Sequence, residues 1–168
     1  MRNLFVILSF MIYYCGNAYI QNAVLRCEDM PIVFYDNPNC MGHTAVIEDN
    51  EDACFNVEII DKTKNMYLVN VFDAFTDNYD CVATGWIRKE NVGVYGWTWD
   101  KYGVPYEQLF KQPDKTSEYQ LAPACSASMI LLDYTDDGDF VKVKYSYNDT
   151  VYIGWIDQYC PDCNAGCN

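Results

Sequence analysis

Two segments of the chain share one pattern, and this internal repeat constrains the fold more than any other feature. VEIIDKTKNMYLVNV occupies residues 57–71 and is followed, after an interval, by Gly-Trp-Ile at residues 85–87. MILLDYTDDGDFVKV occupies residues 129–143 and is followed by Gly-Trp-Ile at residues 154–156. A pattern that returns at a fixed period indicates one structural unit used twice. The sequence therefore predicts two related units of about 70 residues, small enough to benefit from cross-links.

The two copies can be aligned with one three-residue deletion. Asp133 lies 72 positions after Asp61, whereas Trp155 lies 69 positions after Trp86. Upstream, residues 35–38 align with residues 110–113, and the alignment of the central strand places Val69 and Val71 at the positions of Val141 and Val143.

Each unit has the pattern of a β-hairpin. FVKVKYSY at residues 140–147 alternates its side chains with a period of two, which is typical of a half-buried strand. The preceding Asp-Asp-Gly-Asp at residues 136–139 is a tight-turn sequence, and SMILLDY before it is the expected partner strand. NVEIIDK, Lys64-Asn65 and MYLVNVF repeat this arrangement in the first copy. No segment shows a sustained helical apolar stripe, so we predict an all-β fold.

The chain begins like an exported protein. One basic residue, Arg2, precedes an apolar run of 11 residues from Leu4 to Tyr14, and Gly16-Asn17-Ala18 then matches a small-x-small cleavage site. A run this short cannot cross a bilayer, which needs about 20 residues. We expect a signal peptide cleaved after Ala18, a secreted or periplasmic protein, and no transmembrane segment in the mature chain. Lipidation at Cys15 is less favoured because Tyr14 stands where lipidation signals carry a small residue.

Cleavage there would remove one of nine cysteines and leave an even set. An even number of cysteines in an exported chain favours a disulfide framework, whose pairing the sequence leaves open. The Cys-x2-Cys of the tail is half of a zinc site, but the complementary pair is missing and the chain has a single histidine, so no metal is predicted. The cysteines assigned to the framework are Cys27, Cys40, Cys54, Cys81, Cys125, Cys160, Cys163 and Cys167.

The division of the chain follows from the repeat. We predict a signal peptide at 1–18, a first β unit at 19–96, an aromatic linker at 97–106 and a second β unit with a cysteine-rich tail at 107–168. Glycines and a proline mark the linker as a boundary, while its tryptophans and tyrosines favour packing between the units over a free aromatic platform for sugar or peptide.

DGDFVKVKY followed by YIGWIDQYC resembles the C-terminal half of a bacterial SH3-like (SH3b-type) domain. The similarity covers residues 131–160, and residues 66–95 resemble the same family less closely. The resemblance implies two small SH3-like β-barrels in tandem, here stapled by disulfides. It also implies a cell-envelope protein that binds a ligand, commonly a cell-wall peptide of peptidoglycan, without catalysis or cofactor. The eight cysteines depart from the family pattern.

Aromatic residues near the Gly-Trp motifs are the predicted ligand-binding residues, with core packing as the competing interpretation of both tryptophans. No nucleophile motif, phosphate loop or metalloprotease motif is present, and His43 has no evident catalytic partner, so no enzyme is predicted. The ligand-binding candidates are Trp86 and Tyr95 in the first unit and Tyr145, Tyr147 and Trp155 in the second.

The charge of the chain limits its partners. Eleven basic residues against 24 acidic ones give a formal net charge of −13, which argues against nucleic acid and against anionic membranes. Two alternatives to the peptide-binding module stay open: an acidic inhibitor or immunity-type protein that captures a basic secreted enzyme, and a structural surface-assembly protein. Strong salt dependence of binding would favour the inhibitor.

Overall fold

The computed structural model describes residues 21–26, 31–48, 54–75, 80–96, 106–124 and 128–161. The predicted signal peptide with Cys15, the framework cysteines Cys27, Cys125, Cys163 and Cys167, and residues 97–105 of the predicted linker lie outside these ranges.

Within the described residues the fold is antiparallel β, with one short 3-10 helix, and this confirms the all-β prediction. No helix in these ranges is long and apolar enough to cross a membrane. The elements are β1 (Gln21–Leu25), β2 (Ile32–Phe34), β3 (Ala45–Ile47), β4 (Phe55–Lys62), β5 (Met66–Asp73), β6 (Cys81–Arg88), η2 (Lys89–Asn91), β7 (Val92–Gly96), β8 (Tyr106–Phe110), β9 (Tyr119–Pro123), β10 (Met129–Tyr134), β11 (Val141–Tyr147), β12 (Thr150–Ile156) and β13 (Tyr159–Cys160).

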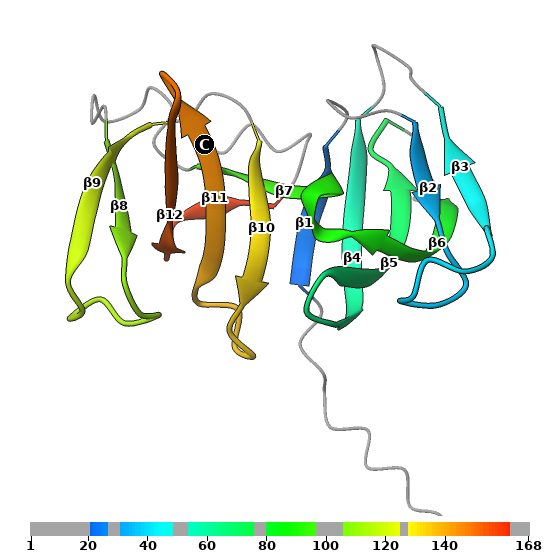
Figure 1. The fold of residues 1–168 in the computed structure, drawn as a ribbon, viewed down its shortest axis with the longest axis horizontal. Helices are drawn as coiled ribbons and strands as arrows, with labels where there is room; N and C mark the ends of the chain where they lie inside the picture. Colours follow the sequence, from blue (N-terminus) through cyan, green and yellow to red (C-terminus); the bar gives the residue numbers. More distant parts are fainter. Residues whose placement is uncertain are drawn as a thin grey trace, which may run out of the picture.

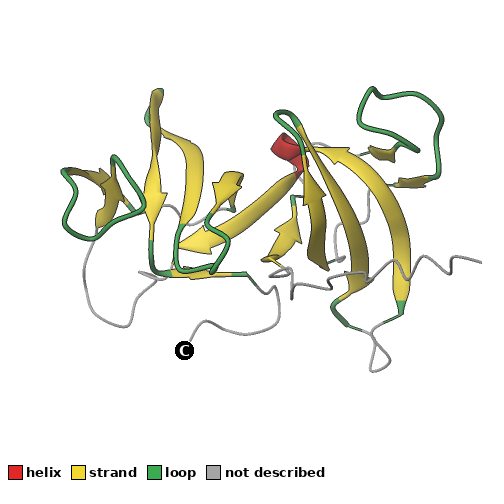
Figure 2. Cartoon of the chain, turned by 90° about the horizontal axis from the view of Figure 1, so that it is seen from below, coloured by secondary structure: helices red, strands yellow, loops and turns green. Residues whose placement is uncertain are grey.

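The main sheet has the order β6-β5-β4-β1-β7-β10-β11-β12-β8-β9, β13 also pairs with β7, and β2 and β3 form a separate ribbon. We call residues 21–91 the first half and residues 106–161 the second half. Figure 1 shows the strands of the two halves as two groups with β7 running between them. In the perpendicular view of Figure 2, the short helix η2 lies at the junction of the two groups.

The two halves repeat the same irregularity at the same place. The β4–β5 ladder shifts register between Ile59 and Asp61, and the β10–β11 ladder shifts between Leu131 and Asp133. These positions are 72 residues apart, as the sequence alignment requires. A β-bulge bends its strand and increases the local twist, so both hairpins curve alike.

The two-stranded ribbons β2–β3 and β8–β9 also correspond. Tyr35, just after β2, forms a β-bridge with Trp86, and Phe110 at the end of β8 pairs with Trp155. This agrees with the alignment of residues 35–38 with residues 110–113. β2–β3 and β8–β9 therefore hold the same place beside the Gly-Trp strand of their own half.

The alignment of the central strand was wrong by two residues. Trp86 pairs with Leu68, whereas Trp155 pairs with Lys142, so Leu68 and not Asn70 corresponds to Lys142. The turn between Tyr134 and Val141 is two residues longer than its counterpart in the first half. A strand with a period of two matches itself after a shift of two residues, so the alternation of V-x-V could not reveal the longer turn.

Strand β7 belongs to the ladders of both halves. Val92 and Gly93 pair with β1, Gly93 and Val94 pair with β10, and Tyr95 and Gly96 pair with β13. β7 therefore lies beside β10 in the second half as β1 lies beside β4 in the first half. The position of a unit boundary between 96 and 107 stays a prediction, because β7 contributes to both halves.

The core follows the alternation of the strands. Val141, Val143 and Tyr145 are buried, while Lys142 and Lys144 on the opposite face are partly exposed, as expected for a half-buried strand. Gly154 lies where β8 crosses β12: a Cβ added there would come within 2.5 Å of the Leu109 Cβ. The absence of a side chain at Gly154 is what permits this close packing.

Candidate functional site

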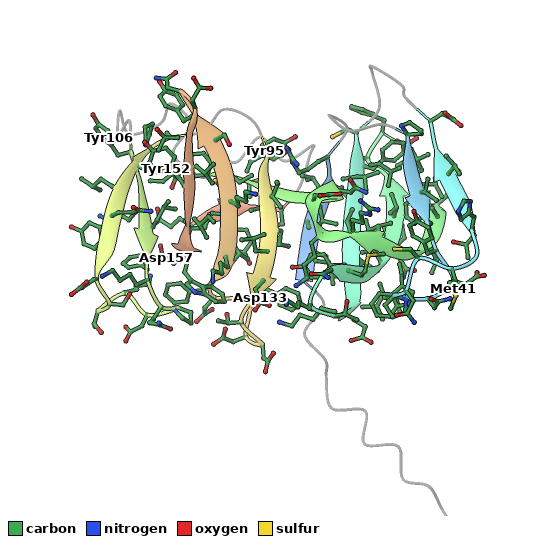
Figure 3. The ribbon with its side chains drawn as sticks, in the orientation of Figure 1. Met41, Tyr95, Tyr106, Asp133, Tyr152 and Asp157 are labelled. Carbon is green, nitrogen blue, oxygen red and sulfur yellow. The ribbon has the colours of Figure 1, made fainter. Side chains whose placement is uncertain are left out.

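The five aromatic residues predicted to bind ligand do not form one site. Trp86 lies on β6 and Tyr95 on β7, whereas Tyr145, Tyr147 and Trp155 lie on β11 and β12 of the second half. Figure 3 labels Tyr95 beside β10, near the junction of the two groups of strands, and Tyr95 pairs in register with Cys160 of β13.

Tyr145 is a core residue. Its side chain is buried, its hydroxyl donates a hydrogen bond to the Pro123 carbonyl at 2.8 Å, and its ring stacks on Tyr152 with centroids 5.5 Å apart. A buried ring held in this way cannot contact a ligand on the surface, so the alternation that buries Val141 and Val143 also decides the place of Tyr145.

Trp86 and Trp155 hold equivalent positions, and each is partly exposed on the outer face of its hairpin. The Lys142 ammonium lies 5.9 Å from the Trp155 ring centroid, within the range of a cation–π contact. Tyr147, at the end of β11, is 43% exposed. Both tryptophans thus share a face with a cation, Trp155 with Lys142 and Trp86 with Arg88, but Arg88 is ion-paired with Glu90.

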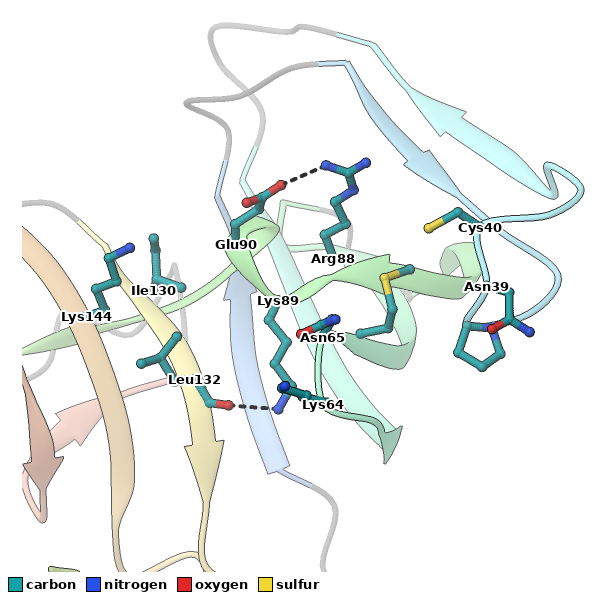
Figure 4. A pocket seen from close by; sticks show the side chains of 12 residues that line it. Asn39, Cys40, Lys64, Asn65, Arg88, Lys89, Glu90, Ile130, Leu132 and Lys144 are labelled. Carbon is teal, nitrogen blue, oxygen red and sulfur yellow. Dashed lines mark hydrogen bonds and ion pairs between the residues drawn. The ribbon is translucent and has the colours of Figure 1, made fainter.

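The structure instead places a groove between the two halves (Figure 4). Its volume is about 650 Å³, within the range of small-molecule sites. The lining combines basic, amide and apolar side chains: Pro38, Asn39, Cys40, Lys64, Asn65, Met66, Arg88, Lys89, Glu90, Ile130, Leu132 and Lys144.

The wall from the first half is a tight turn held by its own hydrogen bonds. The Thr63 N–H donates to the Met66 carbonyl at 2.9 Å, and the Met66 N–H donates to the Thr63 hydroxyl at 3.1 Å. The Asn65 carbonyl accepts a further bond from the Lys89 N–H at 3.1 Å. Lys64 and Asn65 are thereby fixed at the tip of the turn with exposed side chains.

The opposite wall is the bulged strand β10 with its neighbour β11. The Lys89 ammonium reaches across the junction to the Leu132 carbonyl at 2.8 Å and lies 4.5 Å from the Tyr67 ring centroid. Burial lowers the pKa of Lys89, and the nearby Asp133 carboxylate opposes that change. A backbone carbonyl at the β10 bulge of the second half thus accepts a hydrogen bond from a lysine of the first half.

A second lysine crosses the same junction. The Lys62 ammonium is 2.7 Å from an Asp133 carboxylate oxygen, 3.0 Å from the Tyr134 carbonyl and 4.0 Å from the Tyr134 ring centroid. Burial alone would raise the pKa of Asp133, but the bonds from Lys62 and from the Tyr134 N–H together lower it. These contacts set the separation of the groove walls.

The groove is basic although the protein is acidic. Four of its lining residues are cationic and one, Glu90, is anionic, whereas the chain has 11 basic and 24 acidic residues. Glu90 forms an ion pair with Arg88 at 3.3 Å, and Lys89 is engaged by Leu132. Lys64 and Lys144 form no ion pair with any described residue, so their charges are available to a ligand.

The four cysteines within the described ranges divide into two groups. Cys54 and Cys160 are disulfide-bonded, whereas Cys40 and Cys81 carry free, exposed thiols. This differs from the predicted framework, in which all eight cysteines pair. Cys40 has a φ of 58° in the turn after β2, and its side chain lies at the rim of the groove (Figure 4).

No group of three or more His, Cys, Asp and Glu side chains within the described ranges is arranged to hold a metal ion. The ring of His43 packs edge-on against Tyr35, with centroids 5.4 Å apart.

Sequence reasoning missed the groove because its walls come from distant parts of the chain. Lys64 lies in a turn and Lys144 lies on the outward face of a strand, and from the sequence each is expected to be an ordinary solvent-exposed lysine. The only sequence signal was the alternation of lysine with valine at residues 141–144, which places cations on one face of the second unit but not of the first.

Comparisons with known proteins do not assign the chain to a family. No protein-family model matches it, and no curated protein is significantly similar. A structure titled "Structure of NlpC2 from Trichomonas vaginalis" aligns with 84% of this chain and 48% of that chain, at 16% sequence identity and a TM-score of 0.31. The chain therefore spans about half the length of that protein, and a TM-score of 0.31 is too low to identify a shared fold.

Proposed function

We propose that the chain is an exported, non-catalytic binding module made of two SH3-like units, and that it recognises a cell-wall peptide or a related peptide ligand. The observation that carries this proposal is the groove of about 650 Å³ at the junction of the two halves. Binding sites prefer such junctions because two surfaces can enclose a ligand that neither would bury alone.

The lining of the groove suits a peptide. The partly exposed Ile130 and Leu132 offer apolar contacts, and the amides of Asn39 and Asn65 can donate to and accept from a peptide backbone. Apolar side chains supply affinity when they are buried by a ligand, while a few polar groups fix its orientation.

The proposal gives the thiol at the groove no catalytic role. A cysteine nucleophile needs a base within hydrogen-bond reach, and no such bond joins Cys40 to His43 in the described structure. His43 instead contacts the ring of Tyr35. Recognition without turnover is therefore the function that these residues support best.

Co-sedimentation of residues 19–168 with purified peptidoglycan tests the proposal. Asn65→Trp would fill the groove from an exposed turn position, so retention should fall at least about tenfold, the loss expected when a bulky ring occupies a ligand site. Gln108→Trp, at an exposed position of β8 that does not line the groove, is the matched control and should be retained like the natural chain.

Circular dichroism of both variants separates loss of binding from loss of folding. Absence of retention for the natural chain would contradict the wall-peptide ligand. The search would then move to a basic secreted enzyme, captured from envelope extract, or to other copies of a surface assembly.

A further inference from the structure

The distribution of charge around the groove selects its ligand. The chain carries a formal net charge of −13, so a random surface patch of this size should be acidic. The groove instead gathers four of the 11 basic residues and one of the 24 acidic residues. A local reversal of sign inside a concave site raises the concentration of oppositely charged ligands there.

Lys64 and Lys144, which form no ion pair with any described residue, face the groove from opposite walls. Lys64 comes from the β4–β5 turn of the first half, and Lys144 comes from β11 of the second half (Figure 4). Lys144 is partly buried beside Ile130, its register partner on β10. An ammonium next to an apolar wall gains more from an anionic partner than one in open water, because water screens it less.

The basic surface continues beyond the groove over the outer face of β11 and β12. Lys144 is paired in register with Ile153, and Lys142 is paired with Trp155. Ile153 is 46% exposed and the neighbouring Val151 is 54% exposed. Cations thus alternate with exposed apolar side chains along a strip that begins in the groove.

We infer that the ligand is an acidic peptide that enters the groove with its carboxylates between Lys64 and Lys144 and extends across Ile153 and Trp155. This inference rests on the proposed function and specifies the chemistry of its ligand. Carboxylates form charge-assisted hydrogen bonds with lysine, and leucine-like side chains can cover the exposed apolar positions. A nucleic acid would need a longer run of cations than this acidic chain offers.

A pair of labelled peptides tests the inference. The first is a fluorescein-labelled octapeptide in which glutamate alternates with leucine or serine, with a free terminal carboxylate. The second replaces every glutamate with glutamine and ends in an amide. Fluorescence anisotropy at low salt should give the acidic peptide at least about tenfold higher affinity, and added salt should reduce that difference.

Charge reversal locates the binding site. Lys64→Glu combined with Lys144→Glu should weaken binding of the acidic peptide at least about tenfold, because each removed charge-assisted bond is replaced by repulsion. Lys111→Glu combined with Lys115→Glu changes the net charge equally at two exposed positions outside the groove. This control should bind like the natural chain apart from a small effect of net charge.

Equal affinity for the two peptides, or equal loss in both double variants, would overturn the inference. If peptidoglycan is retained and Asn65→Trp releases it while charge reversal has no effect, the proposed function stands and the acidic ligand is excluded. If neither peptidoglycan nor either peptide binds, both proposals fail together.

Discussion

The two halves of the molecule share their ladders but differ on the face that looks outward. In the first half, Asn70 pairs with Thr84, and the Thr84 hydroxyl donates to the Asn70 side chain at 2.9 Å. The equivalent pair in the second half is Lys144 with Ile153. Polar side chains that hydrogen-bond to each other have fewer groups available to bind a ligand. A cation beside an exposed apolar side chain can form both an ionic and an apolar contact with a ligand.

The difference extends to the neighbouring pair. Leu68 lies opposite Trp86 in the first half, and Lys142 lies opposite Trp155 in the second. The inner faces are apolar in both halves, because they build the core. One backbone thus carries two outer surfaces: the first meets the groove at Met66 and Arg88, and the second meets it at Lys144.

The largest difference we expect between equivalent positions concerns the two glycines. A Cβ at Gly154 would lie 2.5 Å from the Leu109 Cβ and 3.1 Å from its backbone, whereas at Gly85 the nearest atom is the Thr44 hydroxyl at 2.7 Å, with the Phe34 Cβ and the Tyr35 carbonyl oxygen at 3.1 Å. Gly154→Ala should lower the free energy of unfolding by about 3 kcal/mol and Gly85→Ala by about 1 kcal/mol. Urea unfolding with disulfides intact measures both, and equal losses would contradict the tighter packing of the second half.

Exchanging the outer faces tests the comparison directly. Lys142→Leu with Lys144→Asn gives the second half the side chains of the first, and affinity for the acidic octapeptide should fall about tenfold. The reciprocal Leu68→Lys with Asn70→Lys should not raise affinity, since Leu68 and Asn70 do not themselves line the groove. A gain in the reciprocal variant would show that the cations suffice without the groove.

The junction contacts are also asymmetric. Lys62 of the first half donates hydrogen bonds to the Asp133 carboxylate and to the Tyr134 carbonyl of the second half. Tyr134 occupies the position in the second half that Lys62 occupies in the first, so the two equivalent residues have different roles at the junction. Lys62→Met should cost about 1 kcal/mol, since the pair is partly exposed and screened by water. The unfolding free energy of this variant should also depend less on salt than that of the natural chain, and an unchanged salt dependence would argue against an ionic junction.

The same pair predicts how stability responds to acid. The lowered pKa of Asp133 means that the folded state holds this carboxylate ionised more firmly than the unfolded chain does. Its contribution is complete above the ordinary carboxyl pKa and is lost as the pH falls through the lowered value. Asp133→Asn should therefore flatten the decrease of the unfolding free energy at acidic pH, which denaturant titrations at successive pH values would reveal.

The smallest effect concerns the cysteines. Cys40→Ser and Cys81→Ser remove exposed free thiols and should change the unfolding free energy by less than about 0.5 kcal/mol. Maleimide labelling of the folded, unreduced protein followed by peptide mapping should mark Cys40 and Cys81 but not Cys54 or Cys160. Protection of Cys40 and Cys81 would restore the fully paired framework.

The sequence was sufficient to predict strands and turns, because alternation and turn residues are local signals. It also placed the two bulged hairpins in correspondence through Asp61 and Asp133. The residue-level match of β5 with β11 failed, since a period of two is unchanged by a shift of two residues. Tyr145 could have been assigned to the core, because it follows Val141 and Val143 on the same face.

The candidate site was less predictable than the fold. Lys64 and Lys144 lie 80 positions apart and share a groove only because the β10 bulge receives Lys62 and Lys89 from the other half. Such long-range packing leaves no mark on local periodicity. The dual pairing of β7 was equally hidden, since residues 92–96 form a short apolar run like that of any buried strand.

The shared strand also has a kinetic consequence for binding. Domain closure requires residues that can absorb a change of backbone angles, usually in loops or at the ends of elements. β7 passes from one half to the other as a strand hydrogen-bonded to β1, β10 and β13, so it offers no hinge at the crossing. The walls of the groove are therefore preorganised, and the rate of ligand capture should be set by diffusion and ionic strength rather than by a closing motion.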